Sequence, residues 1–233
     1  MTYVPERVLV CTPHPDDAEM GVGGTVLNWI REGAAAPLVV VTNGDKGSSD
    51  RKMTSTKLAA MREREQLAAA EVIGWKDVIF LREPDAELED NLRFREKLVR
   101  AIRNIKPDVV RTTDPQKKTF YQHRDHRITG QVTMDAVFPL ARDHLNFPDH
   151  QEEGLEPHKT QFLYFWHSDE PDTHIDISET KDLKIEALLK HESQIAAHRA
   201  AEITKHLKEG SRERGKANGI GPCESFRVIE MRR

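Results

Sequence analysis

The sequence has few of the features that place a protein outside the cell, in a membrane or on nucleic acid. Cysteine is scarce: Cys11 and Cys223 are far apart and match no zinc-binding or redox spacing, so we expect a reducing compartment, the cytoplasm. No run of apolar residues approaches the ~18 that a membrane-spanning helix needs. Residues 1–7 lead straight into a strand-like segment, so we expect no secretory signal and no membrane insertion. The net charge of −4 argues against a general nucleic-acid-binding protein.

What is present suits one α/β domain over residues 1–233. A chain of this length buries a stable core without disulfides, and its 32% of charged residues is typical of long solvated helices around a modest core. Short apolar runs alternate in the first half with segments of helical periodicity. The predicted strands are residues 7–11, 37–42, 77–81 and a fourth that begins at 107, and the predicted helices are residues 23–32, 55–73 and 88–105. This alternation predicts a Rossmann-like, mostly parallel sheet flanked by helices.

The second half is less regular, and we expect it to add short strands at an edge of the sheet. Residues 161–166 and 174–177 have the composition of short strands, which we expect to be antiparallel additions, and residues 224–231 are a candidate last strand. Residues 181–208 are predicted to be mostly helical. The charged run at 205–216 is interpreted as a solvated, flexible loop.

His14, Asp16 and Asp17 follow directly after the first predicted strand. The carboxyl ends of parallel strands are where ligands bind in such sheets. Two neighbouring carboxylates repel each other unless a cation compensates them, and zinc accepts a mixture of His and Asp ligands. The spacing lets His14 and Asp17 point toward one ion, while Asp16 faces elsewhere and could hold a water molecule. The alternative is that Asp16 or Asp17 caps the following helix and that His14 packs locally.

His123 and His126 form a second cluster, about ten residues after the fourth predicted strand. Residues three apart share one face of a helix, so one imidazole can bind a metal while the other reaches beyond it. His14, Asp17 and one of these histidines would supply three ligands and leave one position open, which is the arrangement of catalytic zinc sites. Taken alone, the pair is also compatible with an ordinary, solvated helix start. The placement of both clusters at the same sheet edge favours the metal site.

These motifs resemble the signature of the PIG-L/LmbE-like zinc-dependent N-deacetylases, a family that removes acetyl groups from N-acetylglucosaminyl compounds. Residues 13–25 read PHPDDAEMGVGGT, and HRDH stands at 123–126 where the family has HPDH. Further matches follow in the family's order, at residues 62–65 with Gly74, at 82–88, at 191–194 (HESQ) and at 224–228. The pattern is nearest to the branch of diacetylchitobiose and N-acetylglucosamine deacetylases. Relatives in this family often assemble as trimers or hexamers, so the resemblance also implies a homo-oligomer.

Carried over position by position, the resemblance implies a hydrolase that removes an N-acetyl group from a small-molecule amino-sugar substrate with the help of Zn2+. It implies zinc ligands at His14, Asp17 and His126, with a metal-bound water as the nucleophile. Asp16 becomes the general base, and His123 becomes a charged or proton-donating partner. The proton that the leaving amine needs could come from His123 or from protonated Asp16. Another divalent metal could replace zinc, because availability can override ligand preference.

The resemblance also implies contacts with the sugar for Arg62, Asp85 and Tyr121. For Tyr121, the alternative is a ring that covers the rim of the pocket. Two positions depart from the family pattern: Ala18 stands where many members have a glutamate, and Arg124 replaces the proline of HPDH. Neither change removes a proposed ligand, and both bear on the choice of substrate more than on the chemistry.

The alternative function is a Rossmann-like domain that binds a nucleotide or S-adenosylmethionine. Gly21, Gly23 and Gly24 follow the first strand, but the third glycine of GxGxxG would fall at Val26, and no acidic residue ends the second strand. We therefore expect these glycines to allow close packing of helix against sheet. A non-catalytic protein of the same fold would require an impaired site, whereas every proposed ligand is present.

Overall fold

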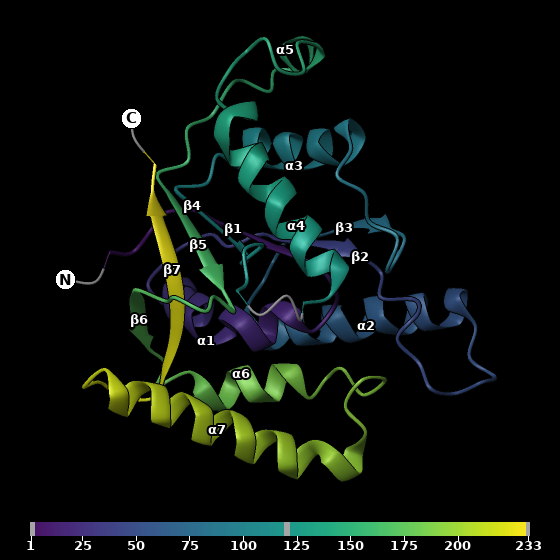
Figure 1. Cartoon of the computed structure of the whole chain (residues 1–233), viewed down its shortest axis with the longest axis vertical. Helices are drawn as coiled ribbons and strands as arrows, with labels where there is room; N and C mark the ends of the chain where they lie inside the picture. Colours follow the sequence, from purple (N-terminus) through teal and green to yellow (C-terminus); the bar gives the residue numbers. More distant parts are fainter. Residues whose placement is uncertain (1–2, 119–121, 232–233) are drawn as a thin grey trace.

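The computed structural model describes residues 3–118 and 122–231, and its strands form a seven-stranded sheet (Figure 1). The strands are β1 Val8–Thr12, β2 Leu38–Thr42, β3 Val78–Glu83, β4 Val109–Thr113, β5 Phe162–Trp166, β6 Thr173–Asp176 and β7 Cys223–Glu230. Their order across the sheet is β3-β2-β1-β4-β5-β7-β6. Strands β1 to β5 are mutually parallel, and β7 runs antiparallel to β5 and β6. The predicted Rossmann-like, mostly parallel sheet is confirmed.

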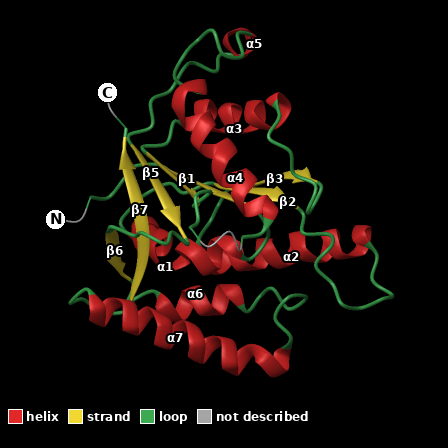
Figure 2. Ribbon diagram, in the orientation of Figure 1, coloured by secondary structure: helices red, strands yellow, loops and turns green. Residues whose placement is uncertain are grey.

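Helices cover both faces of this sheet (Figure 2). The α-helices are α1 Asp17–Arg31, α2 Ser55–Ile73, α3 Leu92–Ile105, α4 Arg124–Asp135, α5 Asp149–Glu152, α6 Lys181–Leu188 and α7 Ala200–Ala217. A π-helical turn, η1 Ala136–Leu140, follows α4, and a 3₁₀ turn, η2 Ala197–Arg199, precedes α7. Helix α6 packs against α1 and α2, and α7 lies outside α6 (Figure 1). Among the helices of the described residues, none is both long enough and apolar enough to cross a membrane.

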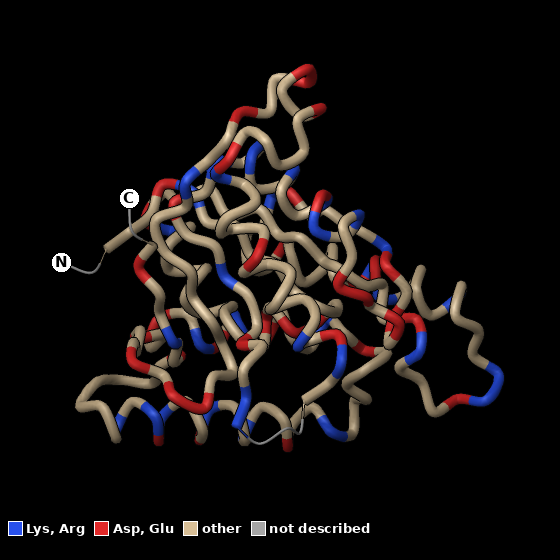
Figure 3. Tube along the Cα trace, turned by 45° about the horizontal axis from the view of Figure 1, so that its top comes forward, with Lys and Arg blue, Asp and Glu red and all other residues tan. Residues whose placement is uncertain are grey.

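Successive side chains of the central strands point to opposite faces of the sheet, and this divides the core into two layers. In β1, Val8 and Val10 point into the layer shared with α1 and α2, whereas Leu9 and Cys11 point into the layer shared with α3 and α4. All four side chains are fully buried, as expected for a parallel sheet that is covered on both faces. Figure 3 shows acidic and basic residues interspersed along the chain, in keeping with a net charge of only −4.

The expectation that residues 161–166 add an antiparallel edge strand is wrong. This segment is β5, which pairs in parallel with β4 and lies inside the sheet. Leu163 to Trp166 are all buried, and such a continuous apolar run is typical of a parallel strand with both faces covered. The predicted strand at 174–177 does lie at the edge, as β6, and pairs antiparallel with β7.

Two helices begin at other residues than the sequence predicted. Helix α1 begins at Asp17, six residues before the predicted start, because Gly21, Gly23 and Gly24 interrupt the apolar pattern without interrupting the helix. A Cβ on Gly21 would lie 2.5 Å from Trp166, so the sheet lies too close for any side chain there, which is the close packing we expected. Helix α3 begins at Leu92 and not at 88, because the Asn91 side chain accepts a hydrogen bond from the Phe94 amide (3.0 Å) and caps it.

The charged run at 205–216 is helical and not a loop. It forms most of α7, where charges of opposite sign four residues apart, such as Lys205 and Glu209 (3.9 Å), lie on one helix face. The predicted long helix over 181–208 is divided into α6 and α7 by residues 189–199. The high density of charged residues therefore misled the prediction, because a helix held along one side tolerates a polar outer face.

Candidate active site

His14, Asp17 and His126 come together at the carboxyl edge of the sheet. Strand β1 lies between β2 and β4, and the order of the strands along the chain reverses at this point, which is where ligands commonly bind in open α/β sheets. The Oδ2 atom of Asp17 is 3.0 Å from Nδ1 of His14 and 3.1 Å from Nε2 of His126. One donor atom from each side chain lies within 4.8 Å of the others. The structure thus brings together the two clusters that the sequence analysis placed at one edge.

The turn that carries His14 is held between two strands. Thr42 at the end of β2 donates its amide N–H (2.9 Å) and its hydroxyl (3.0 Å) to the carbonyl oxygen of Pro13. The proline rings at 13 and 15 fix φ on either side of His14. Asp17 begins α1, and its Oδ2 accepts a hydrogen bond from the His14 amide (3.1 Å). The backbone therefore fixes His14 and Asp17 relative to each other.

Two further carboxylates face the other side of the His14 ring. Nε2 of His14 is 3.2 Å from Oδ1 of Asp85, which follows β3, and 3.2 Å from Oδ2 of Asp125 in α4. Asp85 also accepts a hydrogen bond from the Lys46 amide (3.1 Å). Asp125 is fully buried and was not singled out by sequence reasoning, although it lies between the two histidines of HRDH. Its position within that motif is the signal that could have identified it.

The charges of this cluster fit a divalent cation. Burial by itself lowers the pKa of His14, but its hydrogen bonds with the surrounding carboxylates raise the pKa to about 11. Burial raises the pKa of Asp17, yet the imidazoles of His126 and His14 hold this pKa well below its usual range. Oδ1 of Asp125 is buried without a hydrogen-bond partner among the described residues. Three carboxylates around one imidazole carry more negative charge than a protonated ring compensates, and a cation held by His14, Asp17 and His126 would balance it.

Asp16 lies next to this group but points elsewhere. It occupies the N-cap position of α1, with φ of 103°, and its side chain makes no capping hydrogen bond. The alternative that Asp16 serves only as a helix cap is therefore not supported. Its Oδ2 accepts a hydrogen bond from Nη2 of Arg62 (3.1 Å). Burial and the neighbouring charge of Asp17 raise the pKa of Asp16 to about 7.

A network of buried side chains holds Asp16 in this left-handed conformation, which is strained for a residue other than glycine. The Asp16 amide donates to Oε1 of Gln66 (3.3 Å), and Nε2 of Gln66 donates to Oε1 of Glu19 (2.6 Å). The other oxygen of Glu19 is 3.5 Å from Nε2 of His191. Glu19, which follows Ala18, therefore turns toward Gln66 and His191. Sequence reasoning missed Gln66, because no local pattern reveals a contact between α1 and α2.

Arg62 is buried and bound by the loops around Asp16. Nη2 donates to the carbonyl oxygen of Pro15 (2.6 Å) as well as to Asp16, and Nη1 donates to the carbonyl oxygen of Gly44 (3.1 Å). A Cβ on Gly44 would overlap the guanidinium, so this turn passes directly against it. The side chain thus clamps the loop after β1 to the loop after β2, beside the site.

His123 is an exposed residue beside His14. It is the N-cap residue of α4, and its Nδ1 accepts a hydrogen bond from the Asp125 amide (3.2 Å). Its ring centroid is 4.8 Å from that of His14, and burial together with the positive charge of His14 lowers the pKa of His123. Arg124, which departs from the family motif, donates through Nε to the Leu88 carbonyl (3.1 Å). Tyr121 lies outside the described residues.

Comparisons with known proteins identify relatives of this chain. The family model described as GlcNAc-PI de-N-acetylase (PIG-L) matches residues 9–137, from β1 through α4. The diacetylchitobiose deacetylase of Thermococcus kodakarensis is 32% identical over 189 residues, which are 81% of this chain and 70% of that protein.

Solved structures extend the likeness over nearly the whole chain. The N,N'-diacetylchitobiose deacetylase of Pyrococcus horikoshii, solved with its inhibitor MPG, has a TM-score of 0.91 and 28% identity over 97% of this chain and 84% of its own. GalB, the 4-carboxy-2-hydroxymuconate hydratase of Pseudomonas putida, has a TM-score of 0.81 and 19% identity over 98% of both chains. The second likeness shows the fold alone, and it means that the fold by itself does not select a reaction.

Proposed function

The chain belongs to the GlcNAc-PI de-N-acetylase (PIG-L) family, and on that premise we propose that it is a metal-dependent hydrolase that removes the N-acetyl group from an N-acetylglucosaminyl substrate. The observation that carries the proposal is the buried group of His14, Asp17 and His126, with the carboxylate of Asp16 next to it but directed away. The two relatives named above that are described as diacetylchitobiose deacetylases support the same reaction.

We assign His14, Asp17 and His126 as the metal ligands and zinc as the metal. Two imidazoles and one carboxylate form a ligand set that zinc accepts, and three protein ligands leave a position for substrate. When bound, zinc polarises a carbonyl oxygen and makes water nucleophilic near neutral pH. Asp85 and Asp125, which contact Nε2 of His14, orient that ring and increase the basicity of its donor atom.

In this proposal Asp16 is the general base. Arg62 occupies its Oδ2, so Oδ1 is the atom that takes a proton from the attacking water. A pKa raised to about 7 suits a base that works near neutral pH. Because Arg62 is bound on one side by backbone carbonyls and on the other by Asp16, we propose that it positions the base. A direct contact between Arg62 and the sugar stays a prediction.

We propose that His123, whose ring lies next to that of His14, supplies a hydrogen-bond donor. Its Nδ1 accepts from the Asp125 amide, so the proton of the neutral ring is on Nε2, the atom left to face a substrate. We propose that this N–H stabilises the oxygen that becomes negatively charged as the amide is attacked. The leaving amine then takes its proton from Asp16, which has just received one, or from His123. Contacts of Asp85 and Tyr121 with sugar hydroxyls stay predictions.

Binding of a nucleotide or of S-adenosylmethionine is disfavoured by the packing of α1. A Cβ on Gly24 would lie 2.7 Å from Ile177, and one on Gly21 would lie 2.5 Å from Trp166. The glycines therefore face protein side chains, and no space remains beside them for a pyrophosphate.

Three broader predictions accompany this proposal. A cytoplasmic location is supported by Cys11 and Cys223, which are both buried free thiols. A single domain over residues 1–233 is supported by the sheet, which draws strands from both halves of the described chain. Assembly into a homo-oligomer stays a prediction, which size-exclusion chromatography with light scattering can test.

The proposed activity is tested by acetate release from a panel of N-acetylated glucosamine compounds. We expect acetate and a free amine in equal amounts, and a loss of at least about 100-fold in rate after removal of the metal with a chelator, because the metal contributes several kcal/mol to charge stabilisation. Zinc added back should restore the rate, and elemental analysis should give one metal ion per chain. Turnover that persists in the fully metal-free protein would contradict the proposal.

Replacement of Gln66 by Met tests the network behind the base. We expect kcat to fall by about 10- to 100-fold with little change in KM or metal content, because Asp16 loses the partner of its amide and small displacements of a catalytic group are costly. Arg64→Met, at an exposed position of the same helix, is the matched control and should change none of these quantities. An unchanged kcat in Gln66→Met would exclude a positioning role.

A further inference from the structure

One motif of the family pattern, HESQ at residues 191–194, has no part in the proposed chemistry, and the structure connects it to Asp16. The motif forms a turn at the end of α6, in which the amides of Gln194 and Ile195 both donate to the carbonyl oxygen of His191 (3.0 and 2.9 Å). The His191 side chain is fully buried. The turn therefore places an imidazole in the interior of the protein, between helices and away from solvent.

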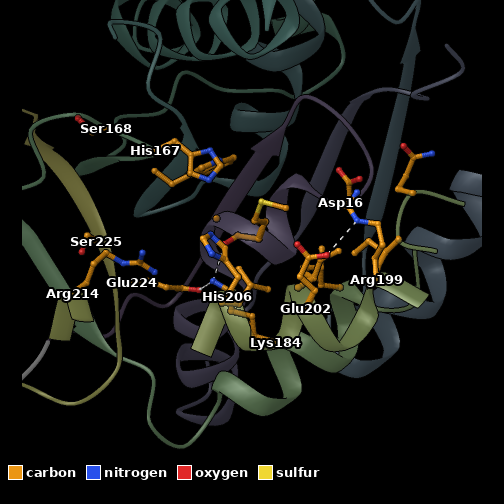
Figure 4. Close-up of a pocket in the computed structure, with 18 of the residues that line it drawn as sticks. Asp16, His167, Ser168, Lys184, Arg199, Glu202, His206, Arg214, Glu224 and Ser225 are labelled. Atoms are coloured by element: carbon orange, nitrogen blue, oxygen red, sulfur yellow. Dashed lines mark hydrogen bonds and ion pairs between the residues drawn. The ribbon is translucent and has the colours of Figure 1, made fainter. Parts of the chain in front are cut away.

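The proposed general base needs support from the interior because its other side is open. Asp16 is half-buried and lies at one end of a groove of about 890 Å³ (Figure 4). Arg62 holds one oxygen of its carboxylate, and its strained backbone is held through the amide, which donates to Oε1 of Gln66 (3.3 Å). The orientation of the Gln66 side chain therefore bears directly on the position of the base.

Glu19 determines how the Gln66 side chain is oriented. The two ends of the Gln66 amide have nearly the same shape, so packing alone does not decide which of them faces Asp16. Nε2 of Gln66 donates to Oε1 of Glu19 (2.6 Å), and an ionised carboxylate can only accept hydrogen bonds. Glu19 thus selects the orientation in which the oxygen of Gln66 faces the Asp16 amide. Gln66 and Glu19 are both fully buried, so bulk water cannot replace either partner.

His191 supplies the positive charge that a buried Glu19 requires. A buried carboxylate without a partner of opposite charge is strongly destabilising. Nε2 of His191 lies 3.5 Å from Oε2 of Glu19, and among the described residues no other cationic group lies within 4.0 Å of this carboxylate. Burial lowers the pKa of His191, but the contact with Glu19 raises it, and the resulting pKa lies above its ordinary value. This balance favours the charged ring.

We propose that His191 is a positioning residue for the general base and acts through Glu19 and Gln66. The inference rests on the proposed function, because it presupposes that Asp16 takes a proton during the reaction. The chain of contacts runs from the turn after α6, through α1 and α2, to the N-cap of α1. It gives a residue that lies beyond the segment matched by the family model, residues 9–137, a role at the reacting centre.

The same turn offers a contact that is separate from this chain. Ser193 donates its amide (2.8 Å) and its hydroxyl (2.6 Å) to the two oxygens of Glu65 on α2. These bonds hold the turn against α2, but they take no part in the contacts that reach Asp16. Ser193→Ala therefore loosens the turn without breaking the chain, which makes it the matched control.

The test measures kcat, KM and metal content with N-acetylglucosamine and N,N'-diacetylchitobiose as substrates. We expect His191→Leu to lower kcat by about tenfold and to leave KM and metal content within about twofold, because small displacements of a catalytic group are costly while the metal ligands stay in place. His191→Gln, which keeps a side-chain N–H for Glu19, should restore kcat to within about threefold of the unmodified protein. Glu19→Leu should act like His191→Leu and provides a second variant if that one fails to fold.

A double variant tests whether His191 acts through the chain. In a Gln66→Met background the chain is already broken, so we expect His191→Leu to lower kcat by less than about twofold further. Ser193→Ala should keep kcat within about twofold of the unmodified protein, even where its unfolding temperature falls.

Several results would overturn the positioning role and leave the deacetylase proposal intact. They are an unchanged kcat in His191→Leu, losses that multiply in the double variant, and a loss in Ser193→Ala as large as that in His191→Leu. The last of these would reduce the motif to general support of the fold. If the unmodified protein released no acetate from any compound of the panel, the proposed function itself would be overturned.

Discussion

The substitution Asp16→Asn is expected to lower kcat by about 10²- to 10⁴-fold, the range that a general base contributes, and to leave the metal in place. The amide keeps the size of Asp16 and an oxygen for Nη2 of Arg62, which lies 3.1 Å away, but it cannot accept a proton. Because Asp16 points away from His14, Asp17 and His126, the ligand set is unchanged. Steady-state kinetics and elemental analysis of the same preparation measure both quantities.

The matched control for this variant is Asp50→Asn, an exposed carboxylate in the loop before α2, which should leave kcat unchanged. A parallel loss of metal and activity in Asp16→Asn would make Asp16 a ligand and not a base. A variant that keeps the full kcat would remove Asp16 from the proton transfer altogether. Either result would require a new assignment of roles within the HPDD motif.

The second large effect is expected for His126→Ala, which should abolish stoichiometric metal binding and reduce activity by more than about 10³-fold. The substitution removes one of three proposed ligands and leaves Asp17 without the imidazole that lies 3.1 Å from its Oδ2. Loss of a residue that merely supports a metal ligand costs about 10- to 100-fold in metal affinity, so loss of a ligand itself should cost more. Metal content after dialysis and titration with zinc measure the effect.

His144→Ala serves as the control, because His144 is an exposed histidine outside the cluster. It should keep both metal and activity. If His126→Ala bound zinc as tightly as the unmodified protein, the ligand assignment would be wrong, and the second group around His14, formed by Asp85, His123 and Asp125, would become the candidate. The two groups share His14, so only variants of the other residues distinguish them.

Sequence reasoning located best those elements whose ends are marked by a residue with a known capping or helix-ending role. Helix α2 spans the predicted residues 55–73, because the Thr54 side chain caps its start and Gly74 adopts the left-handed conformation that ends it. Strands β1 and β2 were found because their apolar runs are short and bounded. The proximity of residues 14–17 to residues 123–126 could be predicted from the expected sheet topology, because parallel strands place their carboxyl ends at one edge of the sheet.

What the sequence could not provide were contacts between elements that no motif joins. The bond from Gln66 to Glu19 links α2 to α1, and the contact of Asp85 with His14 links the loop after β3 to the loop after β1. Such contacts depend on how the helices and loops pack against one another and against the sheet. Local sequence patterns do not indicate this packing. The direction of β5 was missed for a similar reason, because a short apolar run does not reveal its partner.

The reversal of strand order between β1 and β4 also bears on when the proposed metal site can form during synthesis. Val8 pairs with Val109, so the two strands that carry the site are about a hundred residues apart in the chain. At a translation rate of about 5–20 residues per second, the ribosome needs roughly 5 to 20 s to deliver the second strand after the first. Pairing over such a separation also carries an entropic cost of loop closure. Because His14 and Asp17 follow β1 whereas His126 lies in α4, after β4, the three proposed ligands can meet only once α4 has been synthesised.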